Sequence, residues 1–93
     1  MDTIVIEETD IDISELTDIL NKKHLVVFND DVNSFDHVID VFCKILKHTG
    51  EQASQCAIII HHKGKCSVKE GTYDKLKPLC EALLDLKLSA EIQ

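Results

Sequence analysis

The sequence predicts a small α+β domain whose strands and helices follow one another in the order β-α-α-β-α-β, after an acidic extension at residues 1–23. Three observations predict this order: a pentad at 24–28 rich in residues that favour strands, a helical apolar stripe across 35–46, and apolar–polar alternation at 88–92. The chain has 93 residues, which is enough for one domain with one compact core.

The first strand is expected at residues 24–28 and the first helix directly after it. The strand should end at Asn29-Asp30-Asp31, because these side chains compete for nearby backbone amides and favour turns. Ser34 can cap the helix and Asp36 complements its positive end, while its finish is marked by Lys47, His48 and Gly50. The residues that recur at helical spacing on its apolar face are Phe35, Val38, Ile39, Phe42, Ile45 and Leu46.

Residues 51–63 fit either a strand or a helix. The run Ile58-Ile59-Ile60 favours a strand, whereas an apolar stripe at helical spacing ends before Gly64. Periodicity slightly favours the helix, whose stripe consists of Ala53, Cys56, Ala57 and Ile60. A short strand is expected next, at residues 65–69.

The last helix can be capped by Thr72, and an edge strand should close the chain. Pro78 removes an amide donor inside this helix, so either the helix begins later or it kinks near Asp74. The helical stripe comprises Leu76, Leu79, Cys80, Leu83 and Leu84. The buried face of the final strand is expected to consist of Leu88, Ala90 and Ile92.

The charge of the chain is concentrated in the extension. Residues 1–21 contain seven acidic residues and no lysine or arginine, so they hold the whole net charge of −7. Every base in the chain is a lysine, and the planar fork with which arginine binds phosphate is absent. This composition argues against nucleic acid as a partner.

No apolar run approaches the length of a membrane span, and the acidic start does not match a signal peptide, so we expect a cytoplasmic protein without a membrane partner. The four cysteines form no C-x-x-C pair and are interpreted as reduced, apolar residues. His61, His62 and Cys66 lack a fourth ligand at a familiar spacing, so neither a metal site nor a cofactor is expected. No motif places a nucleophile such as Ser34 beside His61, so no catalytic residue is predicted.

Two groups of polar residues flank the predicted helices. Asn29-Asp30-Asp31 follows the first strand and precedes a helix containing Val38-Ile39-Asp40-Val41, and His61 stands shortly before Gly64-Lys65. With these motifs, residues 24–93 resemble the ClpS adaptor family. The resemblance implies a core domain over these residues, with a three-stranded antiparallel sheet and three helices. It also implies that residues 51–63 are helical, with His61 at the end of the helix beside the loop after the first strand.

The resemblance further implies a binding site for a free α-amino group. Its residues here are Asn29, Asp30 and His61, with Asp31 and Asn33 near the site. An α-ammonium group offers three hydrogens and a positive charge, which these side chains can accept and match.

An apolar pocket beside the amine site is implied for the first side chain of the bound protein. Helical spacing places Ala57, Ile60 and His61 on one face, so apolar and polar groups can converge there. The matching pocket positions are Val27, Phe35, Val38, Ala57, Ile60 and Leu88.

The function implied by the resemblance is that of an adaptor, not an enzyme. It would bind N-degron proteins that begin with Leu, Phe, Tyr or Trp and deliver them to a Clp AAA+ unfoldase through the amino-terminal domain of the unfoldase. Asn33-Ser34-Phe35 replaces the usual Thr-Pro-Met, and Ala57 replaces a common methionine, so the ranking of first residues stays open. The alternative is a non-degron interaction module with the same fold.

Overall fold

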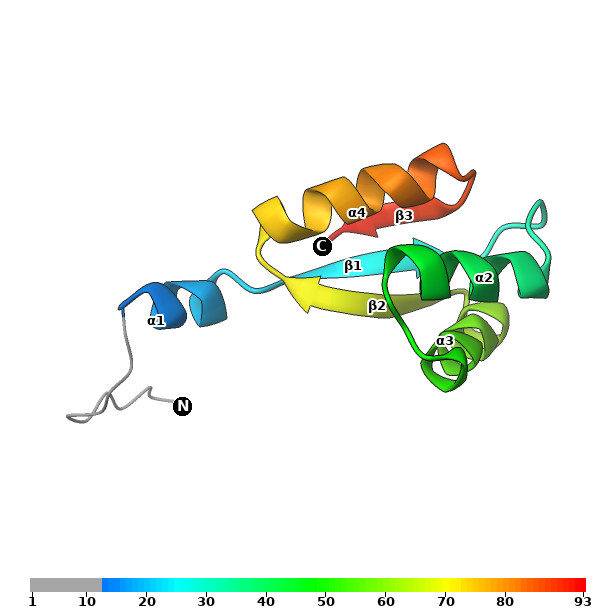
Figure 1. The fold of residues 1–93 in the computed structure, drawn as a ribbon, viewed down its shortest axis with the longest axis horizontal. Helices are drawn as coiled ribbons and strands as arrows, with labels where there is room; N and C mark the ends of the chain where they lie inside the picture. The colour runs from blue at the N-terminus through cyan, green and yellow to red at the C-terminus, as the bar shows by residue number, and fades with distance from the viewer. Residues whose placement is uncertain (1–12) are drawn as a thin grey trace.

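The computed structural model describes residues 13–93, so residues 1–12 of the predicted extension lie outside the described part. A three-stranded sheet is accompanied by three helices, and Figure 1 shows a further short helix beyond the end of the sheet at which the chain enters it. The elements are α1 (Ile13–Leu20), β1 (Lys23–Phe28), α2 (Phe35–Ile45), α3 (Gly50–Lys63), β2 (Lys65–Gly71), α4 (Tyr73–Asp85) and β3 (Ser89–Ile92). From β1 onward this is the predicted order β-α-α-β-α-β.

The sheet is three-stranded and antiparallel, as the family resemblance implied, and its strand order is β2-β1-β3. The central strand β1 pairs with β2 from Lys23↔Gly71 to Phe28↔Lys65, and with β3 from Leu25↔Ile92 to Phe28↔Ser89. The register with β2 shifts between Leu25 and Val26, which is the signature of a bulge. Because β1 is central, the loop that leaves its end lies between both edge strands.

One hydrophobic core joins the sheet to all three of its helices. Leu25 and Val27 contribute from the central strand and are 0% and 2% exposed. Phe42 from α2 is fully buried in the same cluster. The other buried members are Val41, Leu46, Ala53, Ile60, Val68, Leu76, Cys80, Leu83 and Leu88.

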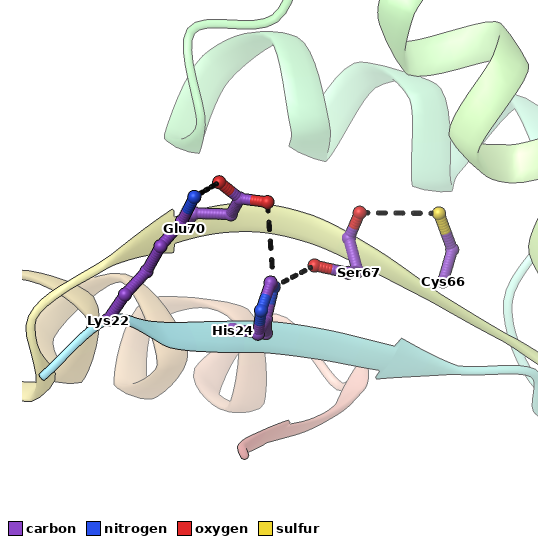
Figure 2. Close-up of polar contacts among 5 residues, drawn as sticks. All are labelled: Lys22, His24, Cys66, Ser67 and Glu70. Carbon is purple, nitrogen blue, oxygen red and sulfur yellow. Dashed lines mark hydrogen bonds and ion pairs between the residues drawn. The ribbon is translucent and has the colours of Figure 1, made fainter. Parts of the chain in front are cut away.

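A small polar network ties the start of β1 to β2 (Figure 2). His24 Nδ1 lies 3.1 Å from Ser67 Oγ and 3.7 Å from Glu70 Oε1, and Lys22 forms an ion pair with the same carboxylate. The hydrogen bond from Lys22 holds the pKa of Glu70 below its ordinary value, and the charges of Lys22 and His24 act in the same direction. The network links Lys22, near the end of the predicted extension, to β2.

The helix caps explain where α2 and α3 begin and end. Ser34 accepts a hydrogen bond from the His37 amide at 3.1 Å, which confirms the predicted cap of α2. The prediction that Gly50 marks the end of α2 is wrong, because Gly50 is the first residue of α3. The missed signal is a capping box in which Thr49 and Gln52 bond each other's backbone amides. Residues 51–63 are helical, as periodicity and the family resemblance indicated.

The last helix runs through its proline. Thr72 is the N-cap residue of α4, although its side chain makes no capping hydrogen bond, and Pro78 lies inside the helix. The alternative of a later start is therefore wrong. Leu84, predicted on the buried stripe, is 48% exposed, whereas Leu76 and Leu83 are buried.

Candidate functional site

A recess opens where the end of β1 meets the first turn of α2, the last turns of α3 and the residue before β3. Its empty volume is about 430 Å³, open mouth included. Every residue predicted for amine binding or for the apolar pocket lines it. The lining residues are Val27, Phe28, Asn29, Asp30, Asn33, Phe35, Val38, Ala57, Ile60, His61 and Leu88.

The floor of the recess is apolar and belongs to the rigid core. Val27, Ala57, Ile60 and Leu88 are each 5% exposed or less. Phe35, by contrast, is 44% exposed, as expected for a ring at the mouth. A bound apolar side chain would therefore touch surfaces that packing already holds in place.

The third helix contributes both apolar and polar groups from one face. Ala57, Ile60 and His61 are separated by three and four residues, so they project on the same side of α3. Gly64 ends the helix in the left-handed backbone conformation with φ 90°, which residues other than glycine rarely adopt. Its carbonyl accepts the Asn29 amide at 2.8 Å and thereby joins the end of α3 to the loop after β1.

The carboxylate of Asp30 is the most heavily bonded group at the rim. Its Oδ1 accepts from the amides of Val32 at 3.1 Å and Asn33 at 3.2 Å, and from Asn33 Nδ2 at 2.9 Å. Its Oδ2 accepts from Asn33 Nδ2 at 3.1 Å and from Ser89 Oγ at 3.3 Å. Burial raises the pKa of Asp30, but these hydrogen bonds outweigh burial, so the pKa lies below its ordinary value. The rim therefore carries a fixed negative charge near neutral pH.

Asn29 and His61 are exposed at the same rim and form no side-chain hydrogen bond within residues 13–93. The His61 ring instead meets the His62 ring edge-on, with 5.4 Å between centroids. The Asn29 amide oxygen and one ring nitrogen of His61 are thus available to accept hydrogen bonds from a ligand.

A shallower depression continues the recess outward. It is lined by Asn29, Asp30, Asp31, Asn33, Phe35 and His61. Asp31, predicted near the site, faces this outer depression and does not line the deeper recess.

Sequence reasoning missed three contributions to the site. Phe28 lines the recess beside Val27, although neighbouring strand residues are expected to face opposite ways. Ser89 bonds Asp30, and the Lys87 carbonyl bonds Asn33, across more than fifty residues of sequence. No local pattern marks a serine or a backbone carbonyl as such a partner.

The described residues offer neither a metal centre nor a membrane span. No group of three or more His, Cys, Asp or Glu residues is placed to hold a metal ion within residues 13–93. Over the same residues, no helix has the length and apolar character needed to cross a membrane.

Comparison with known proteins identifies the family. The sequence model for "ATP-dependent Clp protease adaptor protein ClpS" matches residues 21–91. The chain belongs to the ClpS family. The match covers β1, β2, α2, α3 and α4 and all of β3 except Ile92, and the family is one of adaptors, not enzymes.

Curated ClpS proteins agree with this assignment. The chain is 32% identical over 75 residues to the ClpS protein of Campylobacter jejuni strain 81-176, covering 74% of this chain and 78% of the relative. It is 29% identical over 68 residues to the ClpS protein of Streptomyces avermitilis, covering 73% of this chain and 65% of that relative's length. Both relatives are named as ATP-dependent Clp protease adapter proteins.

A solved structure shares the fold. Agrobacterium tumefaciens ClpS2 bound to L-phenylalaninamide superposes with a TM-score of 0.73 at 16% identity, covering 78% of this chain and 95% of that chain. The likeness independently supports the α+β architecture described above.

Proposed function

We propose that the recess binds the free amino terminus of N-degron proteins whose first residue is bulky and hydrophobic. The protein would then deliver them to a Clp-family AAA+ unfoldase. One observation carries the proposal: the polar rim of Asn29, Asp30 and His61 stands directly over an apolar floor inside the core. An amino-terminal residue has the same two parts, an ammonium group next to a side chain.

The rim suits an ammonium group better than an internal peptide. Asn29 and His61 each offer an acceptor, and the charge of Asp30 matches the positive charge of the ligand. An internal peptide supplies one neutral N–H and a chain that continues past the rim. Each hydrogen bond to a charged group contributes about 1.5–3 kcal/mol, so the rim can separate a free terminus from a blocked one.

The apolar floor supplies the second half of the recognition. Burying a leucine or phenylalanine side chain is worth about 1.5–3 kcal/mol. L-phenylalaninamide, the ligand of the Agrobacterium tumefaciens ClpS2 structure, combines a free α-amine with an aromatic side chain. This chemistry is what the rim and floor of the present recess are arranged to hold.

Fluorescence anisotropy with labelled peptides that differ only in their first residue tests the proposal. We expect peptides beginning with Leu, Phe, Tyr or Trp to bind, and peptides beginning with Glu or Lys to bind at least tenfold more weakly. The expected difference corresponds to about 1.4 kcal/mol or more, which burial of one apolar side chain supplies. Equal affinity across the series would refute recognition of the first side chain.

The proposal also covers delivery of the bound protein to the unfoldase. We expect the core, residues 24–93, to hold the peptide, and residues 1–23 to act in transfer to the unfoldase, whose amino-terminal domain would dock on the core in the cytoplasm. Deleting residues 1–21 should leave peptide affinity unchanged and slow degradation of a Phe-first substrate by the reconstituted protease. Loss of peptide affinity in the truncated protein would contradict this division of labour.

A further inference from the structure

Asn33 connects two segments that lie far apart in the sequence. Its side-chain amide donates to both oxygens of Asp30, at 2.9 and 3.1 Å, and to the Lys87 carbonyl at 2.8 Å. The two amide hydrogens are thus divided between a carboxylate in the loop after β1 and the turn between α4 and β3. A turn-forming asparagine would need only local partners.

The turn reached by Asn33 directly precedes a wall of the pocket. Lys87 has φ 70°, a left-handed conformation that costs a non-glycine residue free energy and persists where neighbouring contacts hold it. Leu88 follows, 4% exposed, and lines the recess. Ser89 then donates to Asp30 at 3.3 Å. Both chain neighbours of Leu88 are therefore bonded to the pair formed by Asp30 and Asn33.

We propose that Asn33 is a positioning residue that sets the apolar wall at Leu88 relative to the charge of Asp30, and so determines which first side chains fit. This inference rests on the proposed function of the recess. Asn33 need not touch the ligand in this role. It fixes the separation between the group that matches the ammonium and the wall that meets the side chain.

The consequence is a change in selectivity in addition to affinity. Without the Asn33 amide, the Lys87 carbonyl loses its bond to the loop after β1, and the turn keeps only its backbone bonds to α4 through the amides of Lys87 and Leu88. Leu88 then follows α4 and no longer keeps its place relative to Asp30, so the fit of a large side chain suffers most. We expect Asn33→Ala to weaken binding of a Phe-first peptide about tenfold and that of an Ala-first peptide about twofold. The preference for Phe over Ala should therefore fall about fivefold.

The test compares Asn33→Ala with Val32→Ala as a matched control in the same loop. The Val32 side chain is 83% exposed and does not line the recess, and only its backbone amide bonds Asp30. Val32→Ala should keep the wild-type preference for Phe over Ala. An unchanged preference in Asn33→Ala, with affinities for both peptides lowered equally or not at all, would overturn the inference.

A second variant tests the same inference if Asn33→Ala does not fold. Ser89→Ala removes only the other tie between Asp30 and the wall, from an exposed position. If circular dichroism shows that Asn33→Ala is unfolded, Ser89→Ala decides: a reduced preference for Phe supports the coupling, and an unchanged one overturns it.

A measurement without ligand separates this inference from the proposed function. Carboxyl carbon NMR of Asp30 should show its pKa rising towards the ordinary value in Asn33→Ala, and the Leu88 methyl resonances should shift in the same variant. If Asn33→Ala shows both changes but the wild-type protein binds no Phe-first peptide, the proposed function is refuted and the coupling stands. Absence of both changes would overturn the coupling whatever the peptides do.

Discussion

The two sides of the rim hold their polar groups in opposite ways. On the loop after β1, Asp30 accepts five hydrogen bonds from Val32, Asn33 and Ser89. At the end of α3, His61 is exposed and its side chain forms no hydrogen bond within residues 13–93. One side thus presents a charge whose position is fixed before any ligand arrives, and the other an acceptor that can turn towards it.

Because of this difference, we expect Asp30 to have both a structural and a binding role, and His61 a binding role alone. A preorganised charge needs no rearrangement when the ligand binds, but the loop depends on the same carboxylate for its own hydrogen bonds. Replacing Asp30 should therefore affect both folding and binding. Replacing His61 should affect binding alone.

Asp30→Ala is expected to have the largest effect. It removes the charge proposed to match the ammonium, and the Asn33 donors and the Val32 amide lose Asp30 as their acceptor. We expect binding of a Phe-first peptide to weaken by about 3 kcal/mol and the free energy of unfolding to fall by about 1–3 kcal/mol. Anisotropy and urea unfolding measure the two quantities. Undiminished stability would show that the loop holds its shape without this carboxylate.

His61→Ala is expected to weaken binding by about 1.5 kcal/mol, the lower value for a hydrogen bond to a charged group. The free energy of unfolding should stay within about 0.5 kcal/mol of wild type, as for most surface substitutions. His62→Ala is the matched control, because His62 is adjacent and exposed but does not line the recess. Equal effects of the two substitutions on affinity would remove His61 from the site.

Gly64→Ala tests the link between the two sides. The Gly64 carbonyl accepts a hydrogen bond from the Asn29 amide, and Gly64 has φ 90°. An alanine is strained in this conformation, so Gly64→Ala should lower the free energy of unfolding by about 1–2 kcal/mol. Gly50 is the control, because it begins α3 with open space around it and no positive φ. Gly50→Ala should leave stability unchanged or raise it by up to about 1 kcal/mol. If urea unfolding gave the two variants the same stability, the left-handed cap would have no role in joining the sides.

The smallest effect expected is on stability in acid. The pKa of Asp30 is lower in the folded protein than in the unfolded chain. The ionised carboxylate therefore adds to the free energy of unfolding above the unfolded pKa of about 3.9, and this contribution is lost as the pH falls through the folded pKa. The lowered pKa of Glu70 acts with the same sign. Melting temperatures between about pH 6 and 2 should therefore fall less steeply for Asp30→Asn than for wild type. Parallel curves would show that Asp30 contributes nothing to acid sensitivity.

The sequence predicted those parts of the molecule that local chemistry determines. The Ser34 cap, the helix at 51–63 with His61 near its end, and the alternation after Leu88 all follow from short-range spacing or from the family motifs. The prediction that Gly50 marks the end of α2 is wrong: glycine commonly follows a helix, but here the capping box of Thr49 and Gln52 makes Gly50 the first residue of α3.

The bonds that Ser89 and Lys87 make to the loop could not be predicted from the sequence. They depend on the tertiary packing that brings the start of β3 beside the loop after β1, across more than fifty residues of chain. The same packing makes Phe28 part of the recess. The sequence thus identified which residues gather at the site, and the structure showed which of them are held and which are free.

Isothermal titration calorimetry with three peptides tests the central claim, that rim and floor act together on one amino-terminal residue. The peptides are a Phe-first peptide with a free terminus, its acetylated form, and an Ala-first peptide with a free terminus. The first should bind, and each of the others should bind at least tenfold more weakly, because one lacks the charge and donors and the other the apolar side chain. Equal affinity of the free and acetylated Phe-first peptides would contradict the account, since the rim would then have no role in recognition.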